Sequence, residues 1–243
     1  MYNGATPLFM ASQNGHVDVV RVLVEHGADI NKARDDGATP LYKASTFGHL
    51  EIVRFLVERG ADINKANNNG DTPLLAASTG VAPLWRGWGE VVRFLADRGA
   101  DINKADNEGD TPLFAASRTG NKNIVRILLE KGASVNIPNN DGKTPLMIAV
   151  DHGHFEIVKS LLAYRANLNA MTNEGETAFD IVNEGTPHNQ SKIENLLKTY
   201  QQNNVVTKNI GEYKRYTTLG SLAHSQLDTC LLYTSPSPRD ITP

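Results

Sequence analysis

Two short patterns in the chain imitate loops that hold phosphate or calcium, and each lacks a residue that its chemistry needs. Gly142-Lys143-Thr144 resembles the end of a phosphate-binding loop, but Ile137 stands where that loop would begin with glycine. Turns rich in Asn, Asp and Gly resemble calcium loops, yet they place Lys65 or Lys104 at the first ligand position. Because an ammonium group cannot ligate a cation, neither phosphate nor calcium binding is predicted.

The histidines do not indicate a metal site either. His152 and His154 lie close together, but His154 falls in register with His16 and His49 and is therefore expected to be structural. No Cys or further His stands at a zinc-ligand spacing from His152. No set of Ser, His and Asp stands out, although a triad assembled only in space would leave no such trace. We therefore predict no catalytic residue, no cofactor and no metal, in a protein that is not an enzyme.

Composition excludes several other classes of protein. The 243 residues carry 24 Lys and Arg against 27 Asp and Glu, so no basic surface for nucleic acid is indicated. No apolar run reaches the roughly 18 residues of a membrane-spanning helix, and no secretory signal is visible. A single cysteine excludes an internal disulfide framework. The composition favours an intracellular, cytoplasmic protein, with the nucleus left open.

The elements that would position a binding residue recur with a fixed period. The phrase Gly-x-Thr-Pro-Leu, varied to Gly-Glu-Thr-Ala-Phe in its last copy, recurs at intervals of 33, 33, 39, 33 and 33 residues from Gly4 onward. A second phrase of the type Gly-Ala-Asp-Ile-Asn keeps the same period from Gly27 onward. One unit is therefore expected six times, over residues 1–33, 34–66, 67–105, 106–138, 139–171 and 172–200.

Each unit has the local signals of two short helices. Thr39 can cap a first helix, and Pro40 suits its first position, where the N–H that proline lacks would have no partner. This helix should end before Gly48, and a second helix with an apolar stripe should run to Gly60, where a left-handed backbone suits glycine. A turn or hairpin rich in Asn, Asp and Gly follows. Because one such unit cannot bury its own apolar stripe, the units are expected to stack on their neighbours.

These phrases resemble the ankyrin repeat, with its Thr-Pro-Leu-His-x-Ala signature and a later Gly-Ala-Asp-x-Asn, over about residues 1–200. The resemblance implies an all-α fold, an α-solenoid of helix-turn-helix repeats with protruding β-hairpin turns. The signature histidine is replaced in every unit, for example by Phe9 and Tyr42, so apolar packing is expected to replace its hydrogen bonds. Arg165 stands where the other units have glycine, which predicts a turn that is either strained or reshaped.

The third unit contains about six extra residues, within Thr79–Arg86 between its two helices. Trp85 and Trp88, the two tryptophans of the chain, lie in or beside this insertion. Insertions in repeat arrays often form binding loops, and aromatic anchors dominate interface energies. The alternative is that both indoles fold back over the neighbouring helices.

Both ends differ from the internal units. The first unit lacks a hairpin and a polar outer face, so we expect the natural polypeptide to start upstream. The sixth unit mixes apolar and charged positions, which suits a closing cap. Residues 201–229 lose the period and are expected to form a polar, flexible tail. Residues 230–243 are expected to be non-native, because 230–240 resemble the translation of a sequencing adapter.

The resemblance to the ankyrin repeat implies a binding function. In that family a concave groove lined by hairpin tips and first helices binds other proteins, and the acidic tips here predict a partner with a basic or amide-rich surface. We expect a monomer that binds another protein, with no nucleic acid and no membrane insertion. The candidate protein-binding residues are Arg34, Asp35, Asp36, Ala38, Thr46, Phe47, Asn67, Asn68, Asn69, Asp71, Trp85, Trp88, Asp106, Asn107, Glu108, Asp110, Arg118, Thr119, Asn139, Asn140, Asp141, Lys143, Asp151 and His152.

Two alternatives remain open at this stage. The array could be the targeting or regulatory part of a larger enzyme, such as a kinase or ubiquitin ligase, or of a channel, since arrays of this type accompany such segments. The chain could also be a modification substrate, because Asn31, Asn64, Asn103 and Asn136 resemble the family's hydroxylation sites.

Overall fold

The computed structural model describes residues 4–80, 87–184 and 189–209. The chain divides into two compact parts, residues 1–201 and 202–243, and the repeat units lie in the first part. The predicted insertion loop with Trp85, most of the predicted tail and the adapter-like segment lie outside the described residues. Among the described residues no helix is long and apolar enough to cross a membrane.

Twelve helices make up the described part of the chain, and no described residue belongs to a strand. They come in pairs, as the repeat phrases predict. The helices are α1 Pro7–Asn14, α2 Val17–Glu25, α3 Pro40–Thr46, α4 Leu50–Glu58, α5 Pro73–Ser78, α6 Trp88–Asp97, α7 Pro112–Thr119, α8 Lys122–Glu130, α9 Pro145–Asp151, α10 Phe155–Ala163, α11 Ala178–Glu184 and α12 Gln190–Asn209.

The first helix of each unit begins at the predicted cap. The hydroxyl oxygen of Thr39 accepts a hydrogen bond from the Tyr42 amide at 3.1 Å, and Pro40 occupies the first helical position. The same arrangement begins α1, α5, α7 and α9. Each of these threonines gives a partner to an amide in the first turn that has none within the helix.

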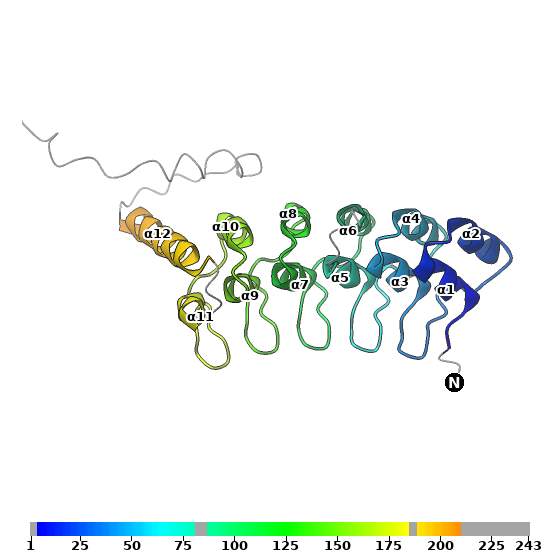
Figure 1. Ribbon diagram of the computed structural model, residues 1–243, viewed down its shortest axis with the longest axis horizontal. Coiled ribbons are helices and arrows are strands. Elements are labelled where there is room, and N and C mark those ends of the chain that lie inside the picture. The colour runs from blue at the N-terminus through cyan, green and yellow to red at the C-terminus, as the bar shows by residue number, and fades with distance from the viewer. Residues whose placement is uncertain (1–3, 81–86, 185–188, 210–243) are drawn as a thin grey trace, which may run out of the picture. The chain divides into compact units, whose positions relative to one another are not determined.

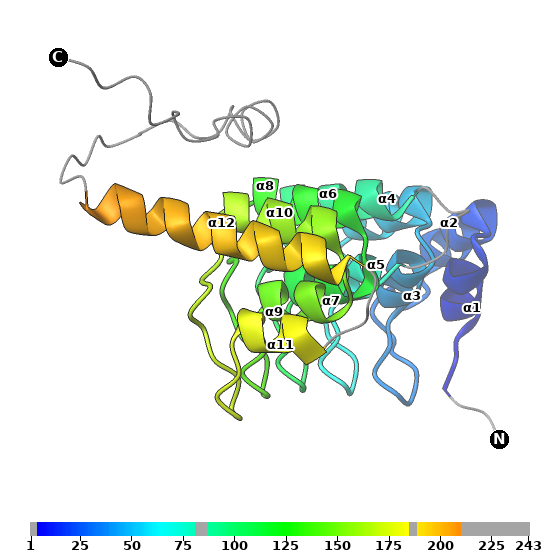
Figure 2. The same ribbon diagram turned by 60° about the vertical axis from the view of Figure 1, so that its left-hand side comes forward.

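The helix pairs of residues 1–201 stack in a row and share one core. Figures 1 and 2 show the first helices between the protruding loops and the second helices. Each first helix contacts the first helix of the next unit, and α4, α6, α8 and α10 follow one another in the same way. Leu41, Ile52 and Leu56 of the second unit are fully buried, as are their counterparts in the third, fourth and fifth units. The fold is therefore the all-α solenoid that the repeats predict.

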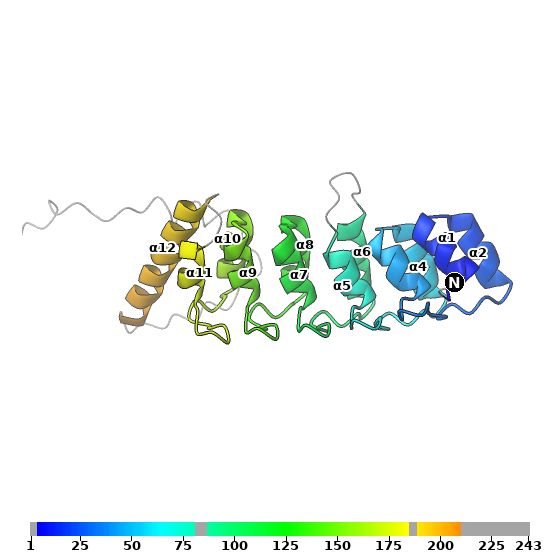
Figure 3. The same cartoon turned by 60° about the horizontal axis from the view of Figure 1, so that its bottom comes forward.

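The loops between units protrude on one side of the row (Figure 3), and they lack the strands that β-hairpin turns imply. In the loop of residues 139–143, two main-chain bonds close the turn, from Asn139 N to Lys143 O at 2.9 Å and from Gly142 N to Asn139 O at 3.0 Å. The Asn139 carboxamide oxygen accepts from the amides of Asp141 and Lys143 at 3.1 and 3.0 Å. Because a side chain takes the place of ladder bonds, the loop is a tight turn stabilised by asparagine.

Asparagines also join neighbouring loop tips. The main-chain N–H of Asn140 donates to Glu108 O at 3.0 Å, and its side-chain Nδ2 donates to Asn107 O at 2.9 Å. Asn68, Asn107 and Asn173 make the same pair of bonds to the loop before them. The tips are therefore fixed relative to one another.

Two sequence expectations are refined at the end of the array. Arg165 adopts a left-handed φ of 65°, in the same region as its glycine counterparts, so this turn is strained and not reshaped. The predicted tail begins later than residue 201, because α12 continues to Asn209. No glycine or proline interrupts residues 190–209, so the main-chain hydrogen bonds of the helix can continue through this polar stretch.

Candidate functional site

The candidate residues of the loops lie along the protruding side of the row. The two tip positions of each loop hold only acidic residues or asparagine. They are Asp35 and Asp36, Asn68 and Asn69, Asn107 and Glu108, Asn140 and Asp141, and Asn173 and Glu174. We call these ten residues the loop surface. All of them except Asp36 are exposed.

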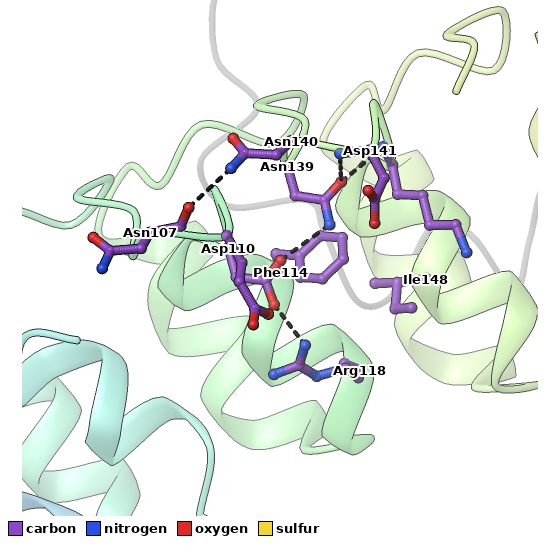
Figure 4. Close-up of a pocket in the computed structure, with 10 residues that line it drawn as sticks. Asn107, Asp110, Phe114, Arg118, Asn139, Asn140, Asp141 and Ile148 are labelled. Carbon is purple, nitrogen blue, oxygen red and sulfur yellow. Dashed lines mark hydrogen bonds and ion pairs between the residues drawn. The ribbon is translucent and has the colours of Figure 1, made fainter. Parts of the chain in front are cut away.

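A pocket opens between the third and fourth loops, those of residues 106–110 and 139–143 (Figure 4). Its volume is about 380 Å³, and Phe114 of α7 and Ile148 of α9 contribute apolar lining. The structure brings eight candidate residues together here, namely Asn107, Glu108, Asp110, Arg118, Asn139, Asn140, Asp141 and Lys143. Two loops and two first helices thus contribute to one cavity.

A buried carboxylate fixes the wall of this pocket. The side chain of Asp110 accepts from Arg118 Nη1 at 2.5 Å and from Asn139 Nδ2 at 3.1 Å, and Asp110 is only 1% exposed. Burial raises the pKa of Asp110 above its usual value, against the opposing effects of Asn139 and Arg118. Since its partners within the chain already satisfy this carboxylate, it shapes the pocket more than it attracts a ligand.

The free charges of the pocket lie on its rim. Glu108 and Asp141 are exposed, and neither side chain has a hydrogen-bond or ion-pair partner among the described residues. Two cations line the pocket. Arg118 forms an ion pair with Asp110, whereas Lys143 forms none with the carboxylates of the described residues. With the Asp110–Arg118 pair neutral in sum, the rim carries one more negative charge than positive charge.

A second polar cluster joins the second and third units. The Tyr42 hydroxyl donates to Asp71 Oδ2 at 3.4 Å, and Asn67 Nδ2 donates to the same oxygen at 2.8 Å. Burial, and then the charge of Asp71, raise the pKa of Tyr42 to about 12. Lys43 is half-buried beside this cluster, and burial lowers its pKa.

The first inter-unit loop has its own ion pair. Arg34 donates through Nε and Nη2 to the Asp36 carboxylate, and this hydrogen bonding holds the pKa of Asp36 at about 2. The Arg34 guanidinium also lies 5.1 Å from the centre of the Phe9 ring. Asp36 is therefore engaged within its own loop.

Two candidate residues are not available to a partner. Ala38 is completely buried, because its position precedes the helix cap and faces the core. Trp88 is 8% exposed, and its indole N–H donates to Thr46 O at 2.9 Å in the preceding unit. The alternative interpretation, in which the indole covers neighbouring helices, is correct for Trp88. Trp85 lies outside the described residues.

The candidates at the ends of the first helices remain apart from the pocket, except for Arg118. Thr46 donates to Tyr42 O at 2.8 Å, and Thr119 donates to Ala116 O at 3.3 Å. Phe47 is 42% exposed, with its ring stacked 6.1 Å from the His49 ring. His152 and Asp151 lie beside each other at the end of α9.

Sequence reasoning missed four residues of these sites, namely Phe114, Ile148, Tyr42 and Lys43. Phe114 and Ile148 line the pocket, and Lys43 lies beside Tyr42 and Arg34. A signal existed, because these positions lie one or two residues after the Thr-Pro-Leu phrase and vary between units while the phrase itself does not. No group of three or more His, Cys, Asp or Glu among the described residues could hold a metal ion.

Comparison with known families identifies the repeat. The family model described as ankyrin repeats (3 copies) matches overlapping segments from residue 1 to residue 207. The matched segments are residues 1–67, 32–106, 64–139, 82–172 and 135–207. No curated protein matches the chain.

Proposed function

Since the chain belongs to the ankyrin repeat family, whose repeats are generally protein–protein interaction modules, we propose that it binds a partner protein through the loop surface and the adjoining pocket. The proposed function is non-enzymatic. It rests chiefly on one observation, which is that Glu108 and Asp141 are exposed and unpaired on the rim of a pocket that two loops and two first helices form.

The fixed spacing of the loops supports this proposal. Paired hydrogen bonds between asparagines and preceding carbonyls hold neighbouring tips, so the rim is ordered before a partner arrives. A preorganised surface loses less conformational entropy on binding. The exposed tip side chains can therefore contribute to affinity and specificity.

The chemistry of the tips indicates the kind of partner. The loop surface contains only carboxylates and carboxamides, so complementary groups are Lys, Arg and side chains that donate amide hydrogen bonds. The apolar lining from Phe114 and Ile148 suits the aliphatic stem of a basic side chain. An interface of ordinary size would bury about 1,600 Å² in total.

A selection from random peptides displayed on phage tests the proposal. We expect enriched peptides to contain Lys or Arg, and the double variant Glu108→Gln, Asp141→Asn to bind them about fivefold to tenfold more weakly. Isothermal titration of synthetic peptides measures this change. Because both side chains are exposed and unpaired, the double variant should keep the melting temperature of the parent.

The matched control removes two carboxylates elsewhere on the same array. Glu90 of α6 and Glu156 of α10 are exposed on second helices, away from the loops. The variant Glu90→Gln, Glu156→Gln has the same net charge as the loop variant and should keep full affinity. Equal weakening by both variants would indicate an effect of net charge and would contradict the proposed site.

A further inference from the structure

The first unit has an exposed apolar face, and in the internal units the corresponding face is covered. Val19 and Val22 of α2 are 49% and 53% exposed. Beside them, a shallow hollow of about 250 Å³ is lined mainly by apolar atoms of Pro7, Leu8 and Leu23, with Ala28 at its edge. In Figure 1, α1 and α2 form one end of the row of helix pairs.

The position of Val19 is buried in every internal unit. The counterparts of Val19 are Ile52, Val91, Ile124 and Ile157, which are 0%, 0%, 1% and 2% exposed. Each of those units has a neighbour on both sides, whereas among the described residues the first unit contacts only the following one. The cover over this position therefore comes from the preceding unit.

Polar groups on the same face lack the partners that their counterparts have. Residues in one register position donate from a ring or side-chain N–H to a main-chain carbonyl near the end of the preceding first helix. These bonds are His49 to Gln13 at 3.0 Å, Trp88 to Thr46 at 2.9 Å, Asn121 to Gly80 at 3.3 Å and His154 to Arg118 at 3.2 Å. His16 holds this position in the first unit, is exposed, and has no side-chain partner among the described residues.

A second donor on this face is equally unpaired. In four units a main-chain N–H after the second helix donates to an asparagine carboxamide of the preceding unit. The bonds are Asp62 to Asn31, Asp101 to Asn64, Ser134 to Asn103 and Asn167 to Asn136, at 2.8–2.9 Å. The corresponding N–H of Asp29 has no acceptor within the described part of the chain.

We propose that this face, formed by α1, α2 and Asp29, is a docking surface for one further helix pair of the same repeat type. The face requires three things at fixed positions: apolar side chains over Val19, a helix-end carbonyl for His16, and an asparagine carboxamide for the Asp29 N–H. An internal unit of this chain presents all three on its following side. The proposal does not depend on the binding function of the loop surface.

The test supplies such a helix pair. A copy of residues 34–66 placed directly before Met1 keeps the 33-residue register and brings Thr46 O and the Asn64 carboxamide of the copy to His16 and Asp29. Hydrogen exchange measured by mass spectrometry should be slower by about tenfold or more in residues 17–30 of the extended protein. Unchanged exchange in this segment would overturn the proposal.

A substitution on the face separates docking from general stabilisation. Val19→Asp should leave the melting temperature of the 243-residue chain nearly unchanged, because the site is exposed there, and should lower that of the extended protein by several degrees. The control Asp18→Asn, at a position exposed in every unit from the first to the fifth, should have the same small effect in both proteins.

Two other outcomes would overturn the proposal. One is an equal loss of melting temperature from Val19→Asp in both proteins. The other is a dimer of the 243-residue chain in analytical ultracentrifugation that Val19→Asp dissociates, because a second copy would then be the occupant of the face.

Discussion

At the scale of single residues, most deviations from the repeat pattern have local physical consequences. Arg165 is an example, since it adopts a φ of 65° where four other units place glycine at φ 86–89°. A Cβ atom added to any of those glycines would have no heavy atom within 4 Å. The energetic cost of Arg165 therefore comes from its backbone conformation and not from a clash with neighbours.

Replacing Arg165 by glycine should therefore stabilise the array. A non-glycine residue in the left-handed region costs about 1–2 kcal/mol, and the extra freedom of glycine in the unfolded chain offsets part of the gain. We expect a net stabilisation of about 0.5–1 kcal/mol in urea unfolding. The control Arg165→Ala keeps the Cβ atom and should gain much less; an equal gain would assign the effect to the loss of the arginine side chain.

Tyr42 provides a second test at this scale. Its pKa of about 12, against 10.0 for an ordinary phenol, follows from burial and from the nearby Asp71 carboxylate. The folded protein keeps this proton between pH 10 and pH 12, whereas the unfolded chain loses it near pH 10. The contribution of Tyr42 to stability is thus present below pH 10 and is lost as the pH rises through about 12.

An absorbance titration of the phenolates at 295 nm measures this shift. We expect one component near pH 12 in the parent and its absence in Tyr42→Phe. If the titration curve near pH 12 stays the same in Tyr42→Phe, Tyr42 does not have the raised pKa.

At the scale of elements, the sequence predicts the helices better than the loops. Thr39, Pro40 and Gly60 mark helix boundaries through local backbone chemistry, so a single sequence suffices to find them. Asn140 lies at a loop tip and also donates a hydrogen bond to the neighbouring loop, at Asn107. Because the bond joins residues 33 positions apart, the sequence alone could not show that Asn140 has this second role. The same holds for Trp88, whose acceptor Thr46 lies in another unit.

The caps of the first helices give a prediction for one element. The Thr111 hydroxyl oxygen accepts from the Phe114 amide at 3.2 Å, and both residues are buried. Thr111→Ala leaves that amide without a partner and should cost about 1–2 kcal/mol in urea unfolding. Thr111→Ser keeps the hydroxyl group and should cost clearly less; equal costs would mean that packing of the methyl group, and not the cap, stabilises α7.

At the scale of the whole molecule, stability comes from contacts between successive units of residues 1–201. The period and the stacking were predictable, because a fixed repeat of apolar positions allows only neighbour-to-neighbour burial. The pocket between the third and fourth loops was not predictable in the same way. Its apolar lining depends on Phe114 and Ile148, which follow a phrase that otherwise marks only the helix start.

The limits of the folded array can be tested by truncation. A chain that ends at Asn209 retains every described helix and lacks the adapter-like segment. We expect its melting temperature to differ from that of the full chain by less than about 2 °C. A larger decrease in circular dichroism melting would show that residues 210–243 contribute to the stability of the repeats.

The central claim is that a partner binds the loop surface beside the pocket. Hydrogen exchange of the protein with and without a Lys- or Arg-containing peptide from the phage selection tests this claim most directly. We predict slower exchange in residues 106–118 and 139–148 on binding, with no change in α8 and α10. Protection of the second helices, with the two loops unchanged, would contradict the account.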